Sequence, residues 1–205
     1  MRLEVISIIA SLALLSACGA ESPGEATDGG AAGSAAPATA GASPATGRFD
    51  WDKWAAVVNE NPCDWFTADE LAALGLPAEG EYMLTSKSKE SICSWKAPDG
   101  SALLSASIYP VPGGPVNLIG QRQEAVRDIR ENSGFFEQVG SGDGTVLAIL
   151  RKDRPMVGIL PYSDDESVTI QINGMWFVTD TTELKAEKRA RVKTFTEALL
   201  KKYGL

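Results

Sequence analysis

Apolar residues recur along this chain with two different spacings, and the spacing distinguishes expected helices from expected strands. The first helical pattern begins near residue 50, where Phe49 and Trp54 flank Asp50 at the spacing of a hydrophobic staple around an N-cap. Pro62 disfavours helical geometry in the residue before it. A helix is therefore predicted from Asp50 to about Asn59, with Trp54 facing the core.

A second short helix is predicted within "NPCDWFTADELAALG". Thr67 and Glu70 have the spacing of a capping box, in which each side chain accepts a hydrogen bond from the other residue's backbone N–H. Leu71 and Leu74 form the apolar side, and Gly75 is a natural C-terminal residue.

The spacing changes to two between residues 81 and 109, which is typical of half-buried strands. In "SICSWK", Cys93 and Trp95 share one face, and "ALLSASIY" alternates in the same way. The segment Ala97–Gly100 between them has the composition of a turn. A hairpin is expected here.

Helical spacing returns from about Val116 to Glu131 after a Pro/Gly-rich break. Three or four further strands are predicted within residues 135–139, 145–152, 155–161 and 167–172. Asn173–Gly174 is a strong hairpin signal and predicts one more strand over residues 175–179. A closing helix is expected from Glu183 to Tyr203.

Strands that follow one another through tight turns favour an antiparallel sheet. The predicted class is α+β, with an antiparallel sheet of about six to seven strands packed by two short N-terminal helices, a middle helix and a C-terminal helix.

The first 47 residues follow neither pattern. Residues 1–17 combine Arg2 with an apolar run from Val5 to Leu15, which is typical of a signal peptide. This apolar run is too short for a transmembrane helix, which needs about 20 apolar residues. Residues 18–47 contain no large apolar side chain, so they are expected to form a disordered tether spanning roughly 30 Å. Residues 48–205 are then a single extracytoplasmic domain.

The end of the signal, Leu15-Ser16-Ala17-Cys18, resembles the lipobox of bacterial lipoproteins. The resemblance implies that Cys18 is lipidated and becomes the first residue of the mature chain. Two or more acyl chains anchor a protein stably. The expected location is the outer face of the bacterial cell membrane, with inner and outer membrane both open. The alternative is a secreted protein whose cleavage site happens to contain Cys18.

Charge and composition exclude several classes of function. The net charge of −8 disfavours nucleic acid, whose phosphates require clustered Lys and Arg. The chain has no histidine, which removes Ser-His-Asp and Cys-His catalysis and HExxH zinc sites. We therefore expect no catalytic residue, no metal, no cofactor and no nucleic-acid partner.

Cys63 and Cys93 remain after signal processing, an even pair in an oxidising compartment. A disulfide closing a loop of about 30 residues stabilises a fold by about 3–4 kcal/mol on the chain-entropy model. The alternative is a reactive thiol, which needs a base or a cation nearby to raise its thiolate fraction. The nearest candidates are lysines 87, 89 and 96. The pairing is favoured, with Trp65 and Trp95 expected to pack around the bridge.

Three polar clusters have weaker chemical interpretations. The acidic group Asp164, Asp165 and Glu166 suggests a calcium site or carboxylate pair, but its spacing favours a solvated turn. The segment "GSGDG" at 140–144 lacks the Gly-Lys-Ser/Thr of a phosphate loop and favours a hairpin turn.

The third cluster is basic. It comprises Arg151, Lys152 and Arg154, and it suggests an anion or acidic-partner site. Its position beside a turn favours an exposed edge.

A lipobox, a low-complexity tether, "NPCDWFTADELAALGL" and then "ICSWKAPDG" occur in this order. Together they resemble an uncharacterised lipoprotein family of actinobacteria, the domain of unknown function 3558. The resemblance implies a location and a fold type, and the family has no established activity.

The expected function is therefore a non-enzymatic, lipid-anchored binding or scaffolding module that recognises a protein partner or envelope ligand through a face of its sheet. One alternative is an inhibitor or immunity lipoprotein against a secreted toxin or hydrolase. Another is a carboxylate-based envelope enzyme, which would need two acids about 5–9 Å apart in one cleft. The pattern singles out no ligand-binding residue.

Overall fold

The computed structural model describes residues 49–140, 145–175, 177 and 179–205. The helices in this part of the chain are α1 (Trp51–Val58), the short 3₁₀ helix η1 (Pro62–Asp64), α2 (Ala68–Ala73), α3 (Gly114–Glu131) and α4 (Thr182–Tyr203). The strands are β1 (Glu81–Leu84), β2 (Ser91–Lys96), β3 (Ala102–Pro110), β4 (Phe136–Val139), β5 (Val146–Arg151), β6 (Met156–Pro161) and β7 (Val168–Asn173). The predicted α+β class is confirmed.

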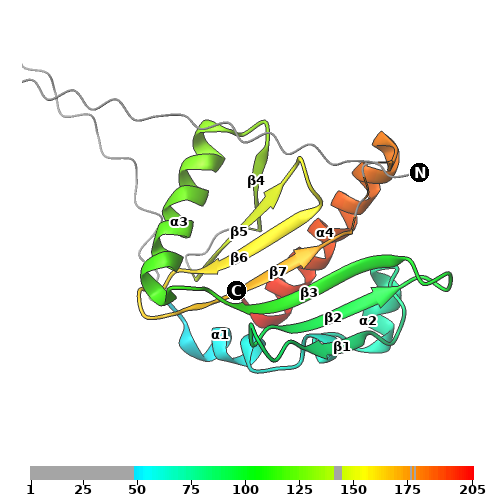
Figure 1. Cartoon of the computed structure of the whole chain (residues 1–205), viewed down its shortest axis with the longest axis horizontal. Helices are drawn as coiled ribbons and strands as arrows, with labels where there is room; N and C mark the ends of the chain where they lie inside the picture. The colour runs from blue at the N-terminus through cyan, green and yellow to red at the C-terminus, as the bar shows by residue number, and fades with distance from the viewer. Residues whose placement is uncertain (1–48, 141–144, 176, 178) are drawn as a thin grey trace, which may run out of the picture. The chain divides into compact units, whose positions relative to one another are not determined.

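The seven described strands form one antiparallel sheet in the order β1-β2-β3-β7-β6-β5-β4 (Figure 1). Two meanders, β1–β3 and β4–β7, are joined where β3 pairs with β7. The long connection between the meanders contains α3, and β7, the last of the described strands, lies in the middle of the sheet.

The hairpin predicted at Asn173–Gly174 is wrong. Asn173 pairs with Ser105 on one side and Met156 on the other, so neither edge of β7 is free for another strand. Met175 and Phe177 lie outside any strand and are exposed, and Trp176 and Val178 are outside the described residues. A turn signal cannot produce a hairpin when the preceding strand is already paired on both edges.

Helices α1, α2 and α4 and the helix η1 pack on one face of the sheet and enclose the larger core. Trp54, Trp65, Trp95 and Phe195 are its largest fully buried side chains. The Phe195 ring centroid lies 5.0 Å from that of Phe66 and 5.4 Å from that of Trp95. Figure 1 shows α4 passing behind β6 and β7, on this face.

The predicted helix caps are confirmed. The Asp50 side chain accepts the Lys53 N–H at the start of α1. Thr67 and Glu70 form the reciprocal capping box at the start of α2. Gly75 has a left-handed backbone with φ of 69° at the end of α2, a conformation that glycine adopts without a steric penalty.

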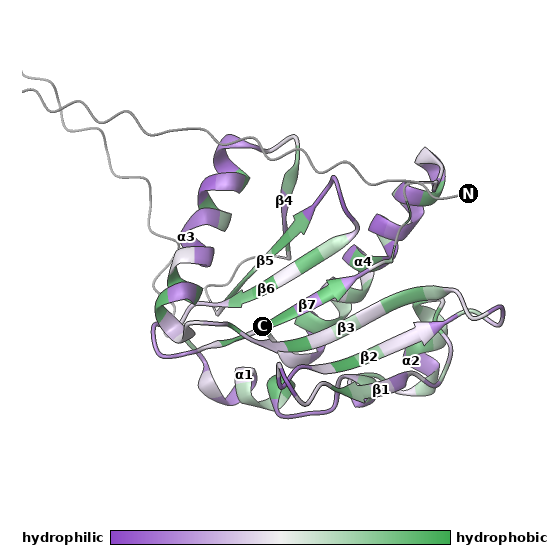
Figure 2. Ribbon diagram, viewed as in Figure 1, coloured by the Kyte–Doolittle hydropathy of each residue, from purple (hydrophilic) through white to green (hydrophobic). Residues whose placement is uncertain are grey.

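Helix α3 packs on the opposite face, where it covers only part of the sheet. Leu118 and Ala125 of α3 are buried against Leu147, Ile149 and Leu160 of β5 and β6. Hydrophobic residues predominate along these two strands, whereas α3 is largely hydrophilic (Figure 2). None of the described helices combines the length and apolar character needed to cross a membrane.

Candidate binding face

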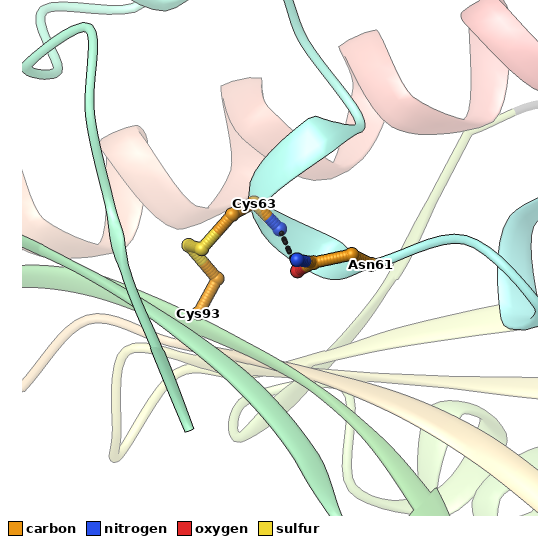
Figure 3. Close-up of a disulfide and its surroundings, with 3 residues drawn as sticks. All are labelled: Asn61, Cys63 and Cys93. Carbon is orange, nitrogen blue, oxygen red and sulfur yellow. Dashed lines mark hydrogen bonds between the residues drawn. A yellow bond between two sulfur atoms is a disulfide. The ribbon is translucent and has the colours of Figure 1, made fainter. Parts of the chain in front are cut away.

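Cys63 of η1 and Cys93 of β2 are joined by a disulfide, with an S–S distance of 2.04 Å and Cα atoms 5.1 Å apart (Figure 3). The Asn61 side chain accepts the Cys63 N–H at 2.9 Å and so holds the turn that presents Cys63. The predicted pairing is confirmed. Because both sulfur atoms are used in the bond, neither cysteine carries a thiol here.

The disulfide lies in tightly packed surroundings. A Cβ atom placed on Gly80 would lie 2.3 Å from the Cys93 sulfur, 3.2 Å from the Cys63 sulfur and 3.1 Å from Nε1 of Trp95. The buried Trp95 N–H has no hydrogen-bond acceptor among the described residues. Trp65, also buried, donates its indole N–H to the Val57 carbonyl at 3.1 Å. This region is core, without room for a ligand beside the bridge.

The structure separates the three acids of the loop between β6 and β7. Asp164 is exposed and lies 2.8 Å from Nη2 of Arg122, which also donates to two carbonyl groups of this loop through Nη1. Glu166 is half-buried and accepts the Trp54 indole N–H at 2.9 Å. The predicted solvated turn is thus right for Asp164 and Asp165 and wrong for Glu166, which ties α1 to the sheet. No cluster of three metal-ligating side chains occurs in the described part of the chain.

The basic residues near β5 are each held by a local partner. Arg151 forms a bidentate pair with Asp153, and its hydrogen bond keeps the pKa of Asp153 below the ordinary value. Lys152 donates to the Ser133 carbonyl at 2.8 Å, and Arg154 lies 3.9 Å from Asp153. These cations are not gathered into an anion site. Of the predicted "GSGDG" turn, residues 141–144 lie outside the described residues.

The half of the sheet that α3 leaves uncovered carries mainly small and polar side chains. Side chains directly opposed in an antiparallel pair share a face, so the register gives its rows. The first row runs across β2, β3, β7 and β6 through Ser94, Ser105, Asn173 and Met156. The second row runs across the same strands through Ile92, Ser107, Gln171 and Gly158. Tyr109 and Thr169 continue this side of the sheet, which we call the open face. Ser107 and Thr169 are themselves buried, so the other residues of these rows form its accessible part.

The open face meets a pocket of about 280 Å³ at the edge of α3. Gly158, Met156 and Ile149 belong to its floor, and Gln121 and Glu124 of α3 belong to its rim. A Cβ atom on Gly158 would contact only Ile149, at 3.9 Å, so the absence of a side chain leaves space between Gln171 and the pocket. An extended ligand could therefore lie along the second row and end in this pocket.

The family described as "Protein of unknown function (DUF3558)" matches residues 13–156, more than half of the chain. The chain belongs to this family. The match includes Cys18, Cys63 and Cys93 and extends from the predicted signal to the first residue of β6. No curated protein matches this DUF3558 chain. No solved structure matches it either.

The residues named in the rows of the open face on β2, β3 and β7 are all uncharged. They carry hydroxyl, carboxamide, aliphatic and phenol groups. Such groups donate and accept hydrogen bonds with uncharged ligands at a low desolvation cost.

Sequence reasoning missed every residue of the open face. The only local signal is the alternation of Ser, Thr and Gln with apolar residues in "ALLSASIY" and "SVTIQI". That alternation is equally typical of the solvated side of any half-buried strand. Only the pairing of β3 with β7 places these polar positions side by side.

Proposed function

We propose that this DUF3558 protein is a lipid-anchored, non-enzymatic binding module of the bacterial envelope that recognises its partner through the open face. The observation that carries the proposal is that α3 covers only one half of this side of the sheet. It packs against β4, β5 and β6, whereas no helix is drawn over β2, β3 and β7 on this side (Figure 1).

Antiparallel sheets in α+β folds commonly have helices on one face and leave the other face in contact with solvent. Here α1, α2 and α4 are all on the opposite face, and the larger core is filled by their side chains. The uncovered half is therefore a property of the topology, and it offers a rigid surface for a ligand.

The acids beside the pocket do not favour the enzymatic alternative. Glu124 lies 3.3 Å and Asp128 lies 3.7 Å from Nη2 of Arg127, and all three are on α3. A shared guanidinium neutralises two carboxylates, whereas glycoside hydrolysis needs one acid protonated and one ionised across a cleft. The absence of histidine points in the same direction.

The anchor and tether give this module its setting. Lipidation at Cys18 would hold the chain at the membrane, and residues 18–47 would let the domain reach partners roughly 30 Å from the surface. Cys18 and this segment lie outside the described residues.

Photo-crosslinking in the native envelope tests the proposal. We expect benzoylphenylalanine at Ser105 or Gln171 on the open face to give a discrete cross-linked species of defined mass. Gln123 on α3 and Thr194 on α4 are matched exposed controls, which should give none. If the open-face positions cross-link no more than the controls, another surface binds or the domain has no such partner.

A further inference from the structure

Strand β1 forms one edge of the sheet and pairs only with β2 (Figure 1). Its three apolar residues Tyr82, Met83 and Leu84 are 48%, 53% and 58% exposed. Edge strands in secreted proteins are ordinarily protected by charges, bulges or proline, because an exposed apolar edge is a template for another strand. Within β1 only Glu81 is charged, and it is paired with Lys96.

The backbone of β1 has free hydrogen-bonding groups at defined positions. The Thr85 N–H donates to the Glu90 carbonyl at 2.9 Å, across the hairpin to β2. Backbone groups alternate in direction along an antiparallel strand, so those of Met83 point towards β2 and those of Tyr82 and Leu84 point away from the sheet. A second strand could pair with these two residues.

The charges around this edge are asymmetric. Glu79 and Glu81 precede the apolar residues, and Lys87 and Lys89 follow them in an exposed turn. Among the described residues, Glu79, Lys87 and Lys89 have no ion-pair partner within 4.0 Å. An antiparallel copy of the same segment would set acids against bases, whereas a parallel copy would set like charges together.

We propose that β1 pairs with β1 of a second copy of this chain, in an antiparallel two-fold arrangement centred on Met83. In this register Tyr82 faces Leu84 of the other copy, and their outward backbone groups exchange hydrogen bonds. Glu79 then lies towards Lys87 of the other copy. The two-fold axis stands perpendicular to the sheet, so the side chains keep the same faces in both copies.

The contact is short, which determines its strength. Stable interfaces bury at least about 1,200 Å², more than one four-residue edge strand provides. We therefore expect association in solution at roughly 10–100 µM, the weak end of the affinity scale. Confinement of anchored chains to a membrane would raise their effective concentration. Met83 is paired with Ile92 and so continues the second row of the open face, but the contact proposed here is made by the backbone edge of β1. This proposal therefore does not depend on the proposed function.

Cross-linking through a single cysteine tests the register. Residues opposed in a non-hydrogen-bonded antiparallel pair have Cα atoms about 4.5 Å apart, within disulfide range. The mature chain carrying Cys18→Ser and Met83→Cys should form a disulfide-linked dimer under mild oxidation. Cys18→Ser with Met175→Cys is the matched control, since Met175 is an exposed methionine outside the sheet. It should cross-link at least several-fold more slowly.

Exchanging the charges of Glu79 and Lys87 tests whether the two β1 strands are antiparallel. Sedimentation equilibrium measures the dimerisation of each variant. Glu79→Lys or Lys87→Glu alone should weaken dimerisation by roughly 3- to 10-fold, because like charges then face each other across the axis. The double variant, or an equimolar mixture of the two single variants, should restore it. Lys201→Glu on α4 makes the same change in net charge as Lys87→Glu and should have little effect.

A chain that stays monomeric to about 1 mM, with Met83→Cys cross-linking no faster than Met175→Cys, overturns the proposal. In that case Lys87 and Lys89 act as charges that keep the edge from pairing. Dimers unaffected by the charge exchange would also overturn it, because they would form through another surface.

Discussion

At the scale of single residues, Gly80 occupies a tightly enclosed position in the described domain. It lies against both sulfur atoms of the disulfide and against Nε1 of Trp95, which has no acceptor among the described residues. Its backbone does not require a left-handed conformation, so the constraint is one of space alone. Glycine is needed here because Cys93, Trp95 and the Cys63 sulfur already fill the volume.

Gly80→Ala should lower the free energy of unfolding by about 1–3 kcal/mol, the usual cost of overpacking a core. Denaturant unfolding without reductant measures it. Gly120→Ala is the matched control, because no atom lies within 4 Å of a Cβ placed on Gly120 in α3. That substitution should leave stability unchanged or raise it by up to about 1 kcal/mol. Equal effects of the two substitutions would contradict the packing argument.

At the scale of elements, the disulfide connects η1 to β2 and so holds the segment between α1 and α2 against the sheet. The two cysteines are 30 residues apart in the sequence. The bridge thus limits how far the helices α1 and α2 can separate from the strands when the chain unfolds.

Replacing both cysteines with alanine should reduce the free energy of unfolding by about 3–4 kcal/mol. Reductant should reduce the stability of the native chain and leave that of the double variant unchanged, which separates the bridge from other effects. A double variant within about 1 kcal/mol of the native chain would show that packing of Trp65 and Trp95 holds these elements without the bridge.

The start of α4 depends on a carboxylate in the preceding loop. Asp180 accepts hydrogen bonds from Nζ of Lys188 at 2.7 Å and from the Phe177 N–H at 2.8 Å. The Lys188 hydrogen bond holds the pKa of Asp180 below its ordinary value of 3.8. A carboxyl whose pKa is lower in the folded state stabilises the fold above its unfolded pKa and loses that effect as the pH falls through its folded pKa.

Asp180→Asn should therefore lower the thermal midpoint at neutral pH and flatten its decline below about pH 4. Thermal unfolding between pH 2.5 and 7 measures both effects. Thr194→Ala, an exposed and uncharged position on α4, serves as the control and should run parallel to the native chain. If the curve of Asp180→Asn is also parallel, the pair with Lys188 does not contribute to the pH dependence.

At the scale of the whole molecule, the pairing of β3 with β7 joins the two meanders into one sheet. Helices cover one face of this sheet, and α3 covers only half of the other face. The proposed lipid at Cys18 would place both surfaces outside the cell membrane, with the tether between them and the bilayer. The open face and the β1 edge are then available to partners in the envelope.

Cys18→Ser should release the protein from the membrane fraction into the soluble extracytoplasmic fraction, because a chain without acyl groups has no stable anchor. Fractionation with intact-mass analysis measures the location and the lipid. A Ser16→Ala control keeps the cysteine and should stay in the membrane fraction. Retention of the Cys18→Ser chain at the membrane would contradict lipidation as the anchor.

Much of this molecule could be predicted from local patterns. The caps at Asp50 and Thr67 depend on hydrogen bonds within a single turn, so their spacing in the sequence is sufficient. The disulfide was predictable because, apart from Cys18, only two cysteines remain to pair. The hairpin predicted at Asn173–Gly174 failed because strand pairing, unlike a helix cap, is not a local property. A turn signal does not indicate which strands already pair with the two edges of β7.

The sequence by itself determined the helices, the alternation of the strands, the pairing of Cys63 with Cys93 and the family. Only the tertiary structure decided the strand order, the half-covered face and the position of β1 at an edge. The physical reason is that periodicity and caps are set by neighbours along the chain. Strand order and register are set by pairings between residues far apart, such as Ser107 with Gln171.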